Sequence, residues 1–308
     1  MVEKFHKTLY FLRFIPLLFA LACRQESPST ADNAIAPKNA KVIPLTPTTV
    51  SFFNQKINLQ ELDLVERLDR EILVNMYFQS STHLALKKSR RYFPLIERIL
   101  KEEKVPDDFK YLCVIESNLS NATSPVGAAG FWQFMPFTAP EYGLKITAEI
   151  DERLNVEKST RAACKLIKEN HDKFGDWINA CAAYNRGAGG LAQDMRIQGV
   201  THFFDTEMNN ETARYVFRIM AMKLIMENPK AYGYYLAPNA GYPPYETRKI
   251  TVSEPIDNLA LWSKKQGTNR KTIRLLNPWI LGNKLSRTSV PCEVELPNSS
   301  SQFTPFRP

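Results

Sequence analysis

Residues 111–136 read YLCVIESNLSNATSPVGAAGFWQFMP, an apolar helical stretch that ends in a carboxylate and runs into a loop with two glycines. Glu116 closes a helix whose neighbouring positions are apolar, which predicts a partly buried carboxyl at the negative end of the helix dipole. Burial and the dipole both raise the pKa of such a carboxyl. Two interpretations stay open from this helix alone: a proton donor suited to glycosidic cleavage, or a glutamate paired with a cation at a helix end.

The loop after this helix has the composition of a ligand-binding segment. Gly127 and Gly130 lack the spacing of a phosphate-binding loop, so we interpret them as turns that let the backbone approach a ligand closely. Trp132, Gln133 and Met135 offer apolar faces and one amide, a mixture that suits sugar rings and N-acetyl groups. The alternative for Trp132 is a core aromatic beside a turn.

Composition limits the class of protein. With 308 residues, 44% of them hydrophobic and 23% charged, the chain can bury one full-size core and a small accessory domain. The net charge of +8 is spread over amphipathic helices among acidic residues, which indicates a solvated surface and no nucleic-acid partner. The five cysteines form no CxxC pair and the four histidines are scattered, so we expect no metal and no cofactor.

Apolar periodicity predicts a mainly α protein. From about residue 58 apolar residues recur at three- and four-residue spacing, and helices are expected at 107–117, 159–173, 176–186 and 211–227. Asp107 or Asp108 is the expected N-cap of the first of these. After residue 245 the pattern changes to a strand at 249–252, short helices at 256–266 and 272–276, and a closing strand at 290–296. This order predicts a small α+β (βααβ) module.

The N-terminus is typical of an export signal. Basic residues precede an apolar run from Phe14 to Ala22, and Cys23 follows a small residue as in a bacterial lipobox, although Ala20 and Leu21 stand in the reverse of the usual order. A proline- and serine-rich stretch at 24–50 reads as a flexible tether. We therefore expect a lipid anchor on Cys23, and the alternative is a soluble secreted form.

Ordered motifs extend over about 105 residues and resemble one family. Glu116-Ser117, followed by Ser124-x-x-Gly127-Ala128-x-Gly130-x-x-Gln133-x-Met135-Pro136, is similar to the signature of the soluble-lytic-transglycosylase-like domain of family 1 lytic transglycosylases, glycoside hydrolase family 23. The supporting blocks are Thr160-x-Ala162-Ala163, Phe174-Gly175-Asp176-Trp177, Ala182-Ala183-Tyr184-Asn185-x-Gly187 and Glu211-Thr212-x-x-Tyr215-Val216. The C-terminal module resembles the LysM-like modules of the membrane-bound D type, with Leu276-Asn277-Pro278 after its second helix.

The resemblance implies a lysozyme-like, goose-type helical catalytic domain and assigns roles to residues. Glu116 would be the sole catalytic acid/base, and Ser117 would help to orient it. The positions that would contact the glycan are Ser124, Gln133, Met135, Tyr184, Asn185, Glu211 and Tyr215. For Tyr184 and Glu211 the alternatives, a core tyrosine and a helix-capping acid, stay open.

The implied activity is non-hydrolytic cleavage of the β-1,4 bond between N-acetylmuramic acid and N-acetylglucosamine, which leaves 1,6-anhydromuramoyl ends. The partners would be peptidoglycan strands and a membrane reached through the lipid anchor, with the protein in the periplasm at the outer membrane. The alternatives are a hydrolysing muramidase of goose-lysozyme type and a non-catalytic peptidoglycan-binding scaffold. The expected parts are a signal peptide (1–22), an anchor cysteine and linker (23–54), a catalytic domain (55–245), a LysM-like module (246–297) and a disordered tail (298–308).

Overall fold

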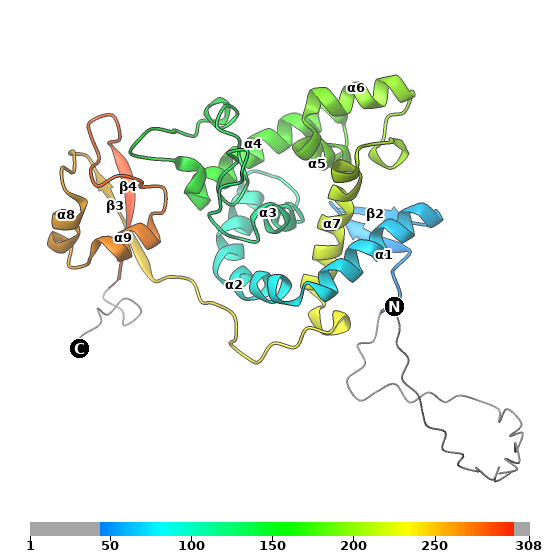
Figure 1. Cartoon of the computed structure of the whole chain (residues 1–308), viewed down its shortest axis with the longest axis horizontal. Helices are drawn as coiled ribbons and strands as arrows, with labels where there is room; N and C mark the ends of the chain where they lie inside the picture. Colours follow the sequence, from blue (N-terminus) through cyan, green and yellow to red (C-terminus); the bar gives the residue numbers. More distant parts are fainter. Residues whose placement is uncertain (1–43, 299–308) are drawn as a thin grey trace, which may run out of the picture. The chain divides into compact units, whose positions relative to one another are not determined.

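The computed structural model describes residues 44–298, which lie within one compact unit of the chain. The predicted signal peptide, Cys23 with most of its linker, and the C-terminal residues from 299 onward lie outside the described residues. Two hydrophobic cores are present, one in a helical body and one in a small C-terminal module (Figure 1). No helix among residues 44–298 is long and apolar enough to cross a bilayer.

The helical body begins with a hairpin of two short antiparallel strands, β1 (Thr49–Phe52) and β2 (Gln55–Asn58). Seven α-helices follow: α1 (Leu62–Tyr77), α2 (Gln79–Glu102), α3 (Phe109–Ser117), α4 (Val156–Phe174), α5 (Trp177–Arg186), α6 (Ala188–Gln198) and α7 (Asn210–Glu227). Short 3-10 turns occur at Ala139–Tyr142, Glu152–Leu154, Phe203–Asp205 and Pro229–Tyr232.

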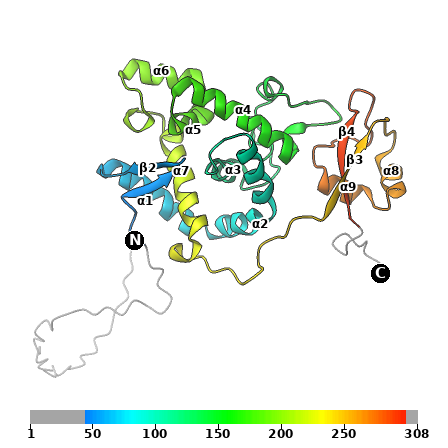
Figure 2. The same cartoon turned by 180° about the vertical axis from the view of Figure 1, so that it is seen from behind.

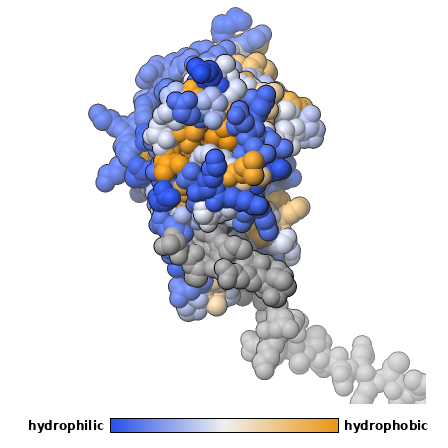
Figure 3. Space-filling model, turned by 90° about the vertical axis from the view of Figure 1, so that its left-hand side faces the viewer, coloured by the Kyte–Doolittle hydropathy of each residue, from blue (hydrophilic) through white to orange (hydrophobic). Residues whose placement is uncertain are grey.

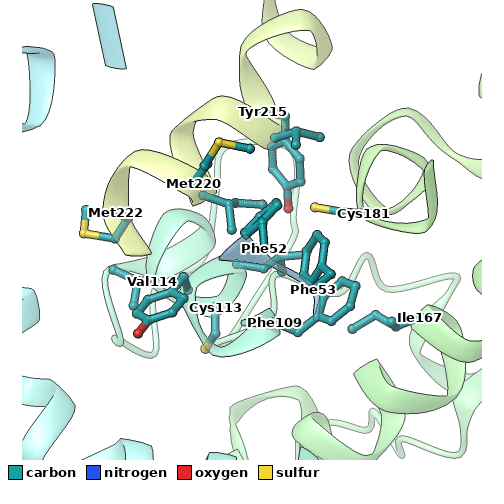
Figure 4. Packing of buried hydrophobic residues seen from close by; sticks show 14 of the residues in the cluster. Phe52, Phe53, Phe109, Cys113, Val114, Ile167, Cys181, Tyr215, Met220 and Met222 are labelled. Atoms are coloured by element: carbon teal, nitrogen blue, oxygen red, sulfur yellow. The ribbon is translucent and has the colours of Figure 1, made fainter. Parts of the chain in front are cut away.

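Helix α3 lies in the middle of this body, among α2, α4 and α7, in both views of the fold (Figures 1 and 2). The hairpin contributes directly to the same core, because Phe52 and Phe53 are fully buried and the ring of Phe53 stacks on that of Phe109 in α3 at 4.3 Å (Figure 4). Aromatic packing of this kind contributes both buried area and geometry. The first described strands thus help to hold the short helix that carries Glu116.

The helix boundaries agree with the periodicity except in two places. α5 ends at Gly187, which has φ of +79°, and α6 starts immediately after it, although periodicity did not predict that helix. α6 contains Gly189 and Gly190, which lower helix propensity and interrupt the apolar pattern, so periodicity could not reveal it. The second difference is the cap of α3.

Asp108 occupies the N-cap position of α3, as one of the two predicted residues, but its side chain makes no capping hydrogen bond. The Asp108 carboxylate accepts hydrogen bonds from the backbone N–H of Phe53 at 2.6 Å and from Nζ of Lys223 in α7 at 2.7 Å. Both charged groups are buried. Leaving a buried charge without a partner costs more free energy than leaving a helix end without a side-chain cap. This ion pair joins the hairpin, α3 and α7.

The C-terminal module has β3 (Thr247–Val252), α8 (Leu259–Lys265), α9 (Arg270–Leu276) and β4 (Cys292–Pro297), and the two strands pair antiparallel. Asn258 and Asn269 cap its helices with their side-chain oxygens. The predicted mainly α class and the βααβ order are confirmed. Figure 3, which faces this end of the molecule, shows small apolar patches separated by hydrophilic surface.

The four described cysteines are Cys113, Cys164, Cys181 and Cys292, and all of them are buried and free. Burial raises the pKa of the Cys113 and Cys181 thiols well above the usual range, so these side chains stay protonated and behave as small apolar groups.

We expect Asp108→Ala to lower the free energy of unfolding of the full chain by about 3 kcal/mol, because it leaves a buried ammonium and a buried backbone N–H without an acceptor. Asp107→Ala is the matched control, since Asp107 is exposed and its pair with Lys110 contributes less than about 1 kcal/mol. Urea denaturation checks both variants. Equal losses in the two would show that the Asp108 ion pair does not join the core.

Candidate active site

Glu116 is the penultimate residue of α3, and its side chain is half-buried against α7. The hydroxyl of Tyr215, on α7, donates a hydrogen bond to Oε1 of Glu116. Tyr215 itself is only 2% exposed (Figure 4). The packing of α3 on α7 therefore brings together two residues that are 99 positions apart in the sequence.

Burial raises the pKa of the Glu116 carboxyl. The hydrogen bond from Tyr215 and the positive charge of Arg218 act in the opposite direction, and the carboxylate of Glu211 adds to the rise. Desolvation wins, because a charged carboxylate loses more by leaving water than one hydrogen bond restores. The result is a carboxyl that holds its proton more tightly than an exposed glutamate, beside a group that is ready to stabilise it once ionised.

The neighbouring tyrosines keep their protons. Burial raises the pKa of Tyr215 and of Tyr184 well above the usual range, and the negative charge of Glu116 raises both further. Their hydroxyls are therefore fixed as hydrogen-bond donors at neutral pH. Tyr184 uses its hydroxyl to donate to the backbone carbonyl of Trp132 at 2.8 Å.

Ser117 hydrogen-bonds within its own turn rather than with Glu116. Its hydroxyl donates to the carbonyl of Cys113 at 3.1 Å and accepts the backbone N–H of Ser120 at 3.4 Å. Asn118, with φ of +50°, ends the helix in the left-handed conformation. Ser117 thus fixes the end of α3, and any effect on Glu116 acts through the position of that helix end.

Residues 124–136 form a closed loop, which we name the Gln133 loop. The Ser124 hydroxyl accepts the backbone N–H of Ala128 at 3.0 Å. The Gln133 side-chain nitrogen donates to the carbonyls of Ala122 and Gly130 at 3.1 and 2.8 Å. Ser124 and Gln133 therefore brace the loop from inside, whereas the Met135 side chain is half-buried.

The core alternative for Trp132 is what the structure shows. Trp132 is fully buried, and its indole N–H donates to the hydroxyl of Thr160 in α4 at 2.9 Å. Thr160 belongs to the Thr160-x-Ala162-Ala163 block. This hydrogen bond therefore joins that block to the one that contains Trp132. Trp132 anchors the Gln133 loop to the helical body.

Sequence reasoning missed Arg153, which supports the loop from the other side. Its guanidinium donates to the carbonyls of Gly127 and Phe134 at 2.7 and 2.9 Å and forms a salt bridge with Asp151. A Cβ added to Gly130, whose φ is +80°, would stand 2.0 Å from the Arg153 carbonyl oxygen, so only glycine fits there. No local pattern distinguishes this arginine from an exposed one.

The end of α5 and the start of α7 meet through Asn185. Its side chain donates to Oε1 of Glu211 at 3.3 Å and accepts the hydroxyl of Thr212 at 2.9 Å. Asn209, not Glu211, is the residue that caps α7, because its side chain accepts the N–H of Thr212. The exposed carboxylate of Glu211 therefore remains at the surface near Glu116, whose pKa it influences.

The arrangement combines one tuned carboxyl with a loop and two helix ends that present hydrogen-bonding groups. Within residues 44–298 no cluster of three His, Cys, Asp or Glu side chains could hold a metal ion. A groove of about 460 Å³ has Tyr92, Phe131, Arg274 and Trp279 among its lining residues, and none of the predicted site residues lines it. The chemistry that this site supports is proton donation and proton acceptance by one carboxyl.

Comparison with known families agrees with this arrangement. Residues 93–204 match the model of the transglycosylase SLT domain, and residues 248–300 match that of the soluble lytic transglycosylase C-terminal LysM-like domain. The membrane-bound lytic murein transglycosylases D of Escherichia coli strain K12 and strain O6:H1 (CFT073) are each 29% identical to the chain over 239 residues.

Those 239 residues are 75% of this chain and 51% of each relative, so the chain spans about half the length of these relatives. Among solved structures, the 70 kDa soluble lytic transglycosylase of Escherichia coli matches 53% of this chain and 30% of its own, at 19% identity and a TM-score of 0.41. The resemblance found in the motifs is confirmed: the chain contains a transglycosylase SLT domain followed by a LysM-like domain, and it is homologous to membrane-bound lytic murein transglycosylase D.

Proposed function

We propose that the chain is a peptidoglycan lytic transglycosylase that cleaves the β-1,4 bond between N-acetylmuramic acid and N-acetylglucosamine and leaves 1,6-anhydromuramoyl ends. One observation carries the proposal: Glu116, inside the SLT domain, is a carboxyl with a raised pKa and a tyrosine donor in place. Retaining and inverting glycosidases use two carboxyl groups. The main motif of this chain holds one, which favours the non-hydrolytic route.

In the first step, protonated Glu116 donates its proton to the oxygen that leaves with N-acetylglucosamine, and the glycosidic bond breaks. The N-acetyl group of the muramoyl residue assists the positive centre that develops at C1. Glu116 is then ionised, and the hydrogen bond from Tyr215 and the charge of Arg218 stabilise the carboxylate. Burial thus raises the pKa of the acid, while these two contacts reduce the free-energy cost of ionising it.

In the second step, the Glu116 carboxylate takes the proton of the muramoyl C6 hydroxyl, and O6 bonds to C1. This step closes the anhydro ring and returns Glu116 to its protonated state, so no water is consumed. The same carboxyl serves as acid and then as base, which requires a pKa near the working pH. We propose Ser124, Gln133, Met135, Tyr184, Asn185 and Glu211 as the glycan contacts, and Ser117 and Tyr215 as residues that position Glu116.

We further propose the order of parts predicted from the sequence: signal peptide 1–22, an anchor and linker from Cys23, a catalytic domain up to residue 245, a LysM-like peptidoglycan-binding module at 246–297 and a tail from 298. We end the linker before Thr49 rather than at residue 54, because residues 49–54 form β1 and the turn of the hairpin, and Phe52 and Phe53 are buried in the helical core. The homologous proteins are named membrane-bound, which supports an exported protein that works in the periplasm. Lipid attachment at Cys23 to the outer membrane is part of this proposal and rests on the sequence around that residue.

Glu116→Gln tests the proton donor. The amide has nearly the same shape but cannot supply a proton, so we expect release of anhydromuropeptides from purified sacculi to fall by about 10²- to 10⁴-fold. Mass spectrometry of the digest gives the products, and Glu66→Gln, at an exposed glutamate of α1, is the control.

Two other results would each contradict part of the proposal. Retention of more than about a tenth of the activity in Glu116→Gln would remove Glu116 from the acid role. Reducing rather than anhydro ends in the wild-type digest would show a hydrolysing muramidase, and no cleavage at all would indicate a binding scaffold.

Tyr215→Phe tests the tuning of the carboxyl. Proton donation needs the protonated acid, so kcat/KM falls as the pH rises through the pKa of Glu116. The Tyr215 hydrogen bond lowers that pKa, and its loss therefore moves the alkaline limb of the pH profile to higher pH. Glu211→Gln removes a negative charge that raises the pKa of Glu116, so the alkaline limb of this variant's pH profile moves to lower pH. If the alkaline limbs of the two variants stay in place or move in the same direction, Glu116 is not the group that titrates in the pH profile.

Cys23→Ala tests the anchor. The wild type should incorporate labelled palmitate and fractionate with membranes, whereas the variant keeps Ala20-x-Ala22 for an ordinary signal peptidase and should appear in the soluble periplasmic fraction. An unlabelled wild type that fractionates like the variant would show secretion without an anchor. That outcome leaves the catalytic assignment unchanged.

A further inference from the structure

Residues 147–154 connect the helical body to the C-terminal module, and we name them the bridging segment. The segment lies between the 3-10 turn at Ala139–Tyr142 and α4, and Figures 1 and 2 both show this part of the chain, in green, reaching the β3–β4 module. Ile150 is 2% exposed and belongs to the core of the C-terminal module, together with Val252 and Trp279. One residue of the catalytic part is thus built into the core of the other module.

Hydrogen bonds fix this insertion on both sides of Ile150. The carbonyl of Glu149 accepts the backbone N–H of Leu281 at 2.8 Å, and the N–H of Asp151 donates to the carbonyl of Trp279 at 2.9 Å. The carboxylate of Glu149 accepts bonds from the backbone N–H and the hydroxyl of Ser286 and from the hydroxyl of Ser289, at 2.7 to 2.9 Å. Backbone pairing of this kind holds the segment in one register with the module.

The same segment also holds the Gln133 loop, through the side chains of Asp151 and Arg153. Asp151 and Arg153 are each 7% exposed, and their side chains form a bidentate pair with N–O distances of 3.0 and 2.7 Å. The remaining nitrogen of the guanidinium donates to the carbonyls of Gly127 and Phe134, which lie near the two ends of the loop. The backbone carbonyl of Arg153 lies against Gly130, where a side chain would not fit.

We propose that the C-terminal module positions the Gln133 loop through the bridging segment, with Arg153 as the positioning residue. The module fixes residues 149–151, Asp151 fixes the guanidinium, and the guanidinium fixes the loop that carries Gln133 and Met135. A planar guanidinium can hold a carboxylate and two carbonyls at once, which an ammonium on a flexible stem cannot. The module therefore contributes to turnover as well as to attachment to the wall. This inference rests on the proposed function where it concerns catalysis.

Arg153→Lys keeps the positive charge and removes the planar guanidinium with its several N–H donors. We expect kcat/KM on purified sacculi to fall about 10- to 100-fold, mainly through KM, because the loop that contacts the glycan is displaced while Glu116 is not. The alkaline limb of the pH profile should stay in place, in contrast to Tyr215→Phe. The control is Arg98→Lys, at an exposed arginine of α2 that forms a salt bridge with Glu102 of the same helix. Assays are run well below the melting temperature of each variant, so lost stability does not count as lost activity.

The coupling to the module is tested without activity, by hydrogen–deuterium exchange of the full chain. Glu149→Ala removes the acceptor of Ser286 and Ser289, and Ile150→Ala weakens the insertion into the module core. In both variants the amides of residues 127–136 should exchange faster than in the wild type. The matched control is Glu254→Ala, at an exposed glutamate of the same module. Exchange within β3 and β4 reports whether the module itself stays folded.

The outcomes separate this inference from the proposed function. Unchanged exchange at residues 127–136 in Glu149→Ala, with β3 and β4 protected, would overturn the coupling, and so would wild-type kinetics in Arg153→Lys. If the wild type releases no anhydro ends, the proposed function fails, and the exchange result still decides whether the module holds the loop. Faster exchange in the loop for Arg153→Lys and Glu149→Ala, with Glu254→Ala unchanged, supports the coupling.

Discussion

The hydrogen bond from Tyr215 to Glu116 is the contact on which the site depends, because it places a stabilising donor beside a carboxyl whose pKa is raised by burial. The bond exists only if α3 and α7 pack in one register. The Asp108–Lys223 ion pair joins the same two helices near the other end of α3, so a second buried polar contact sets that register. A nine-residue helix is too short to be stable alone, and its position is imposed by these tertiary contacts.

The opposing influences on Glu116 give the carboxyl two useful states. Desolvation favours the neutral acid, which the first proton transfer of the proposed reaction needs. Tyr215 and Arg218 favour the carboxylate, which the second transfer needs. A site with desolvation alone would hold its proton too tightly to act as a base, and a site with the donor and the cation alone would lose it too early. The balance explains how one carboxyl can serve both steps.

The Gln133 loop shows how a short irregular segment is made rigid. Ser124 and Gln133 close it from inside, Trp132 anchors it in the core and Arg153 holds its two ends. Loops that carry binding groups normally rely on a scaffold for their precision. Here the scaffold includes the bridging segment, whose other end is part of the C-terminal module core.

Short-range sequence patterns predicted some of these features and did not predict others. Glu116, the glycine turns and the βααβ module follow from residue type, periodicity and motif order, which are properties of short stretches. The contacts of Tyr215 with Glu116 and of Arg153 with the Gln133 loop join distant or unmarked positions, and no spacing rule reveals them. Asp108 stands at the predicted N-cap position of α3, but its side chain does not cap the helix because Lys223, 115 residues away, takes the carboxylate.

The most direct test of this account is the pKa of Glu116 itself, measured by carbon-13 NMR on protein labelled at the glutamate side-chain carboxyls. The Glu116→Gln variant assigns the resonance, because only that signal disappears. We expect the pKa of Glu116 in the free protein to lie above 4.5, the ordinary value of a glutamate side chain. A Glu116 carboxyl that titrates at or below that value would show that it is ionised when substrate binds, and would contradict its role as the proton donor.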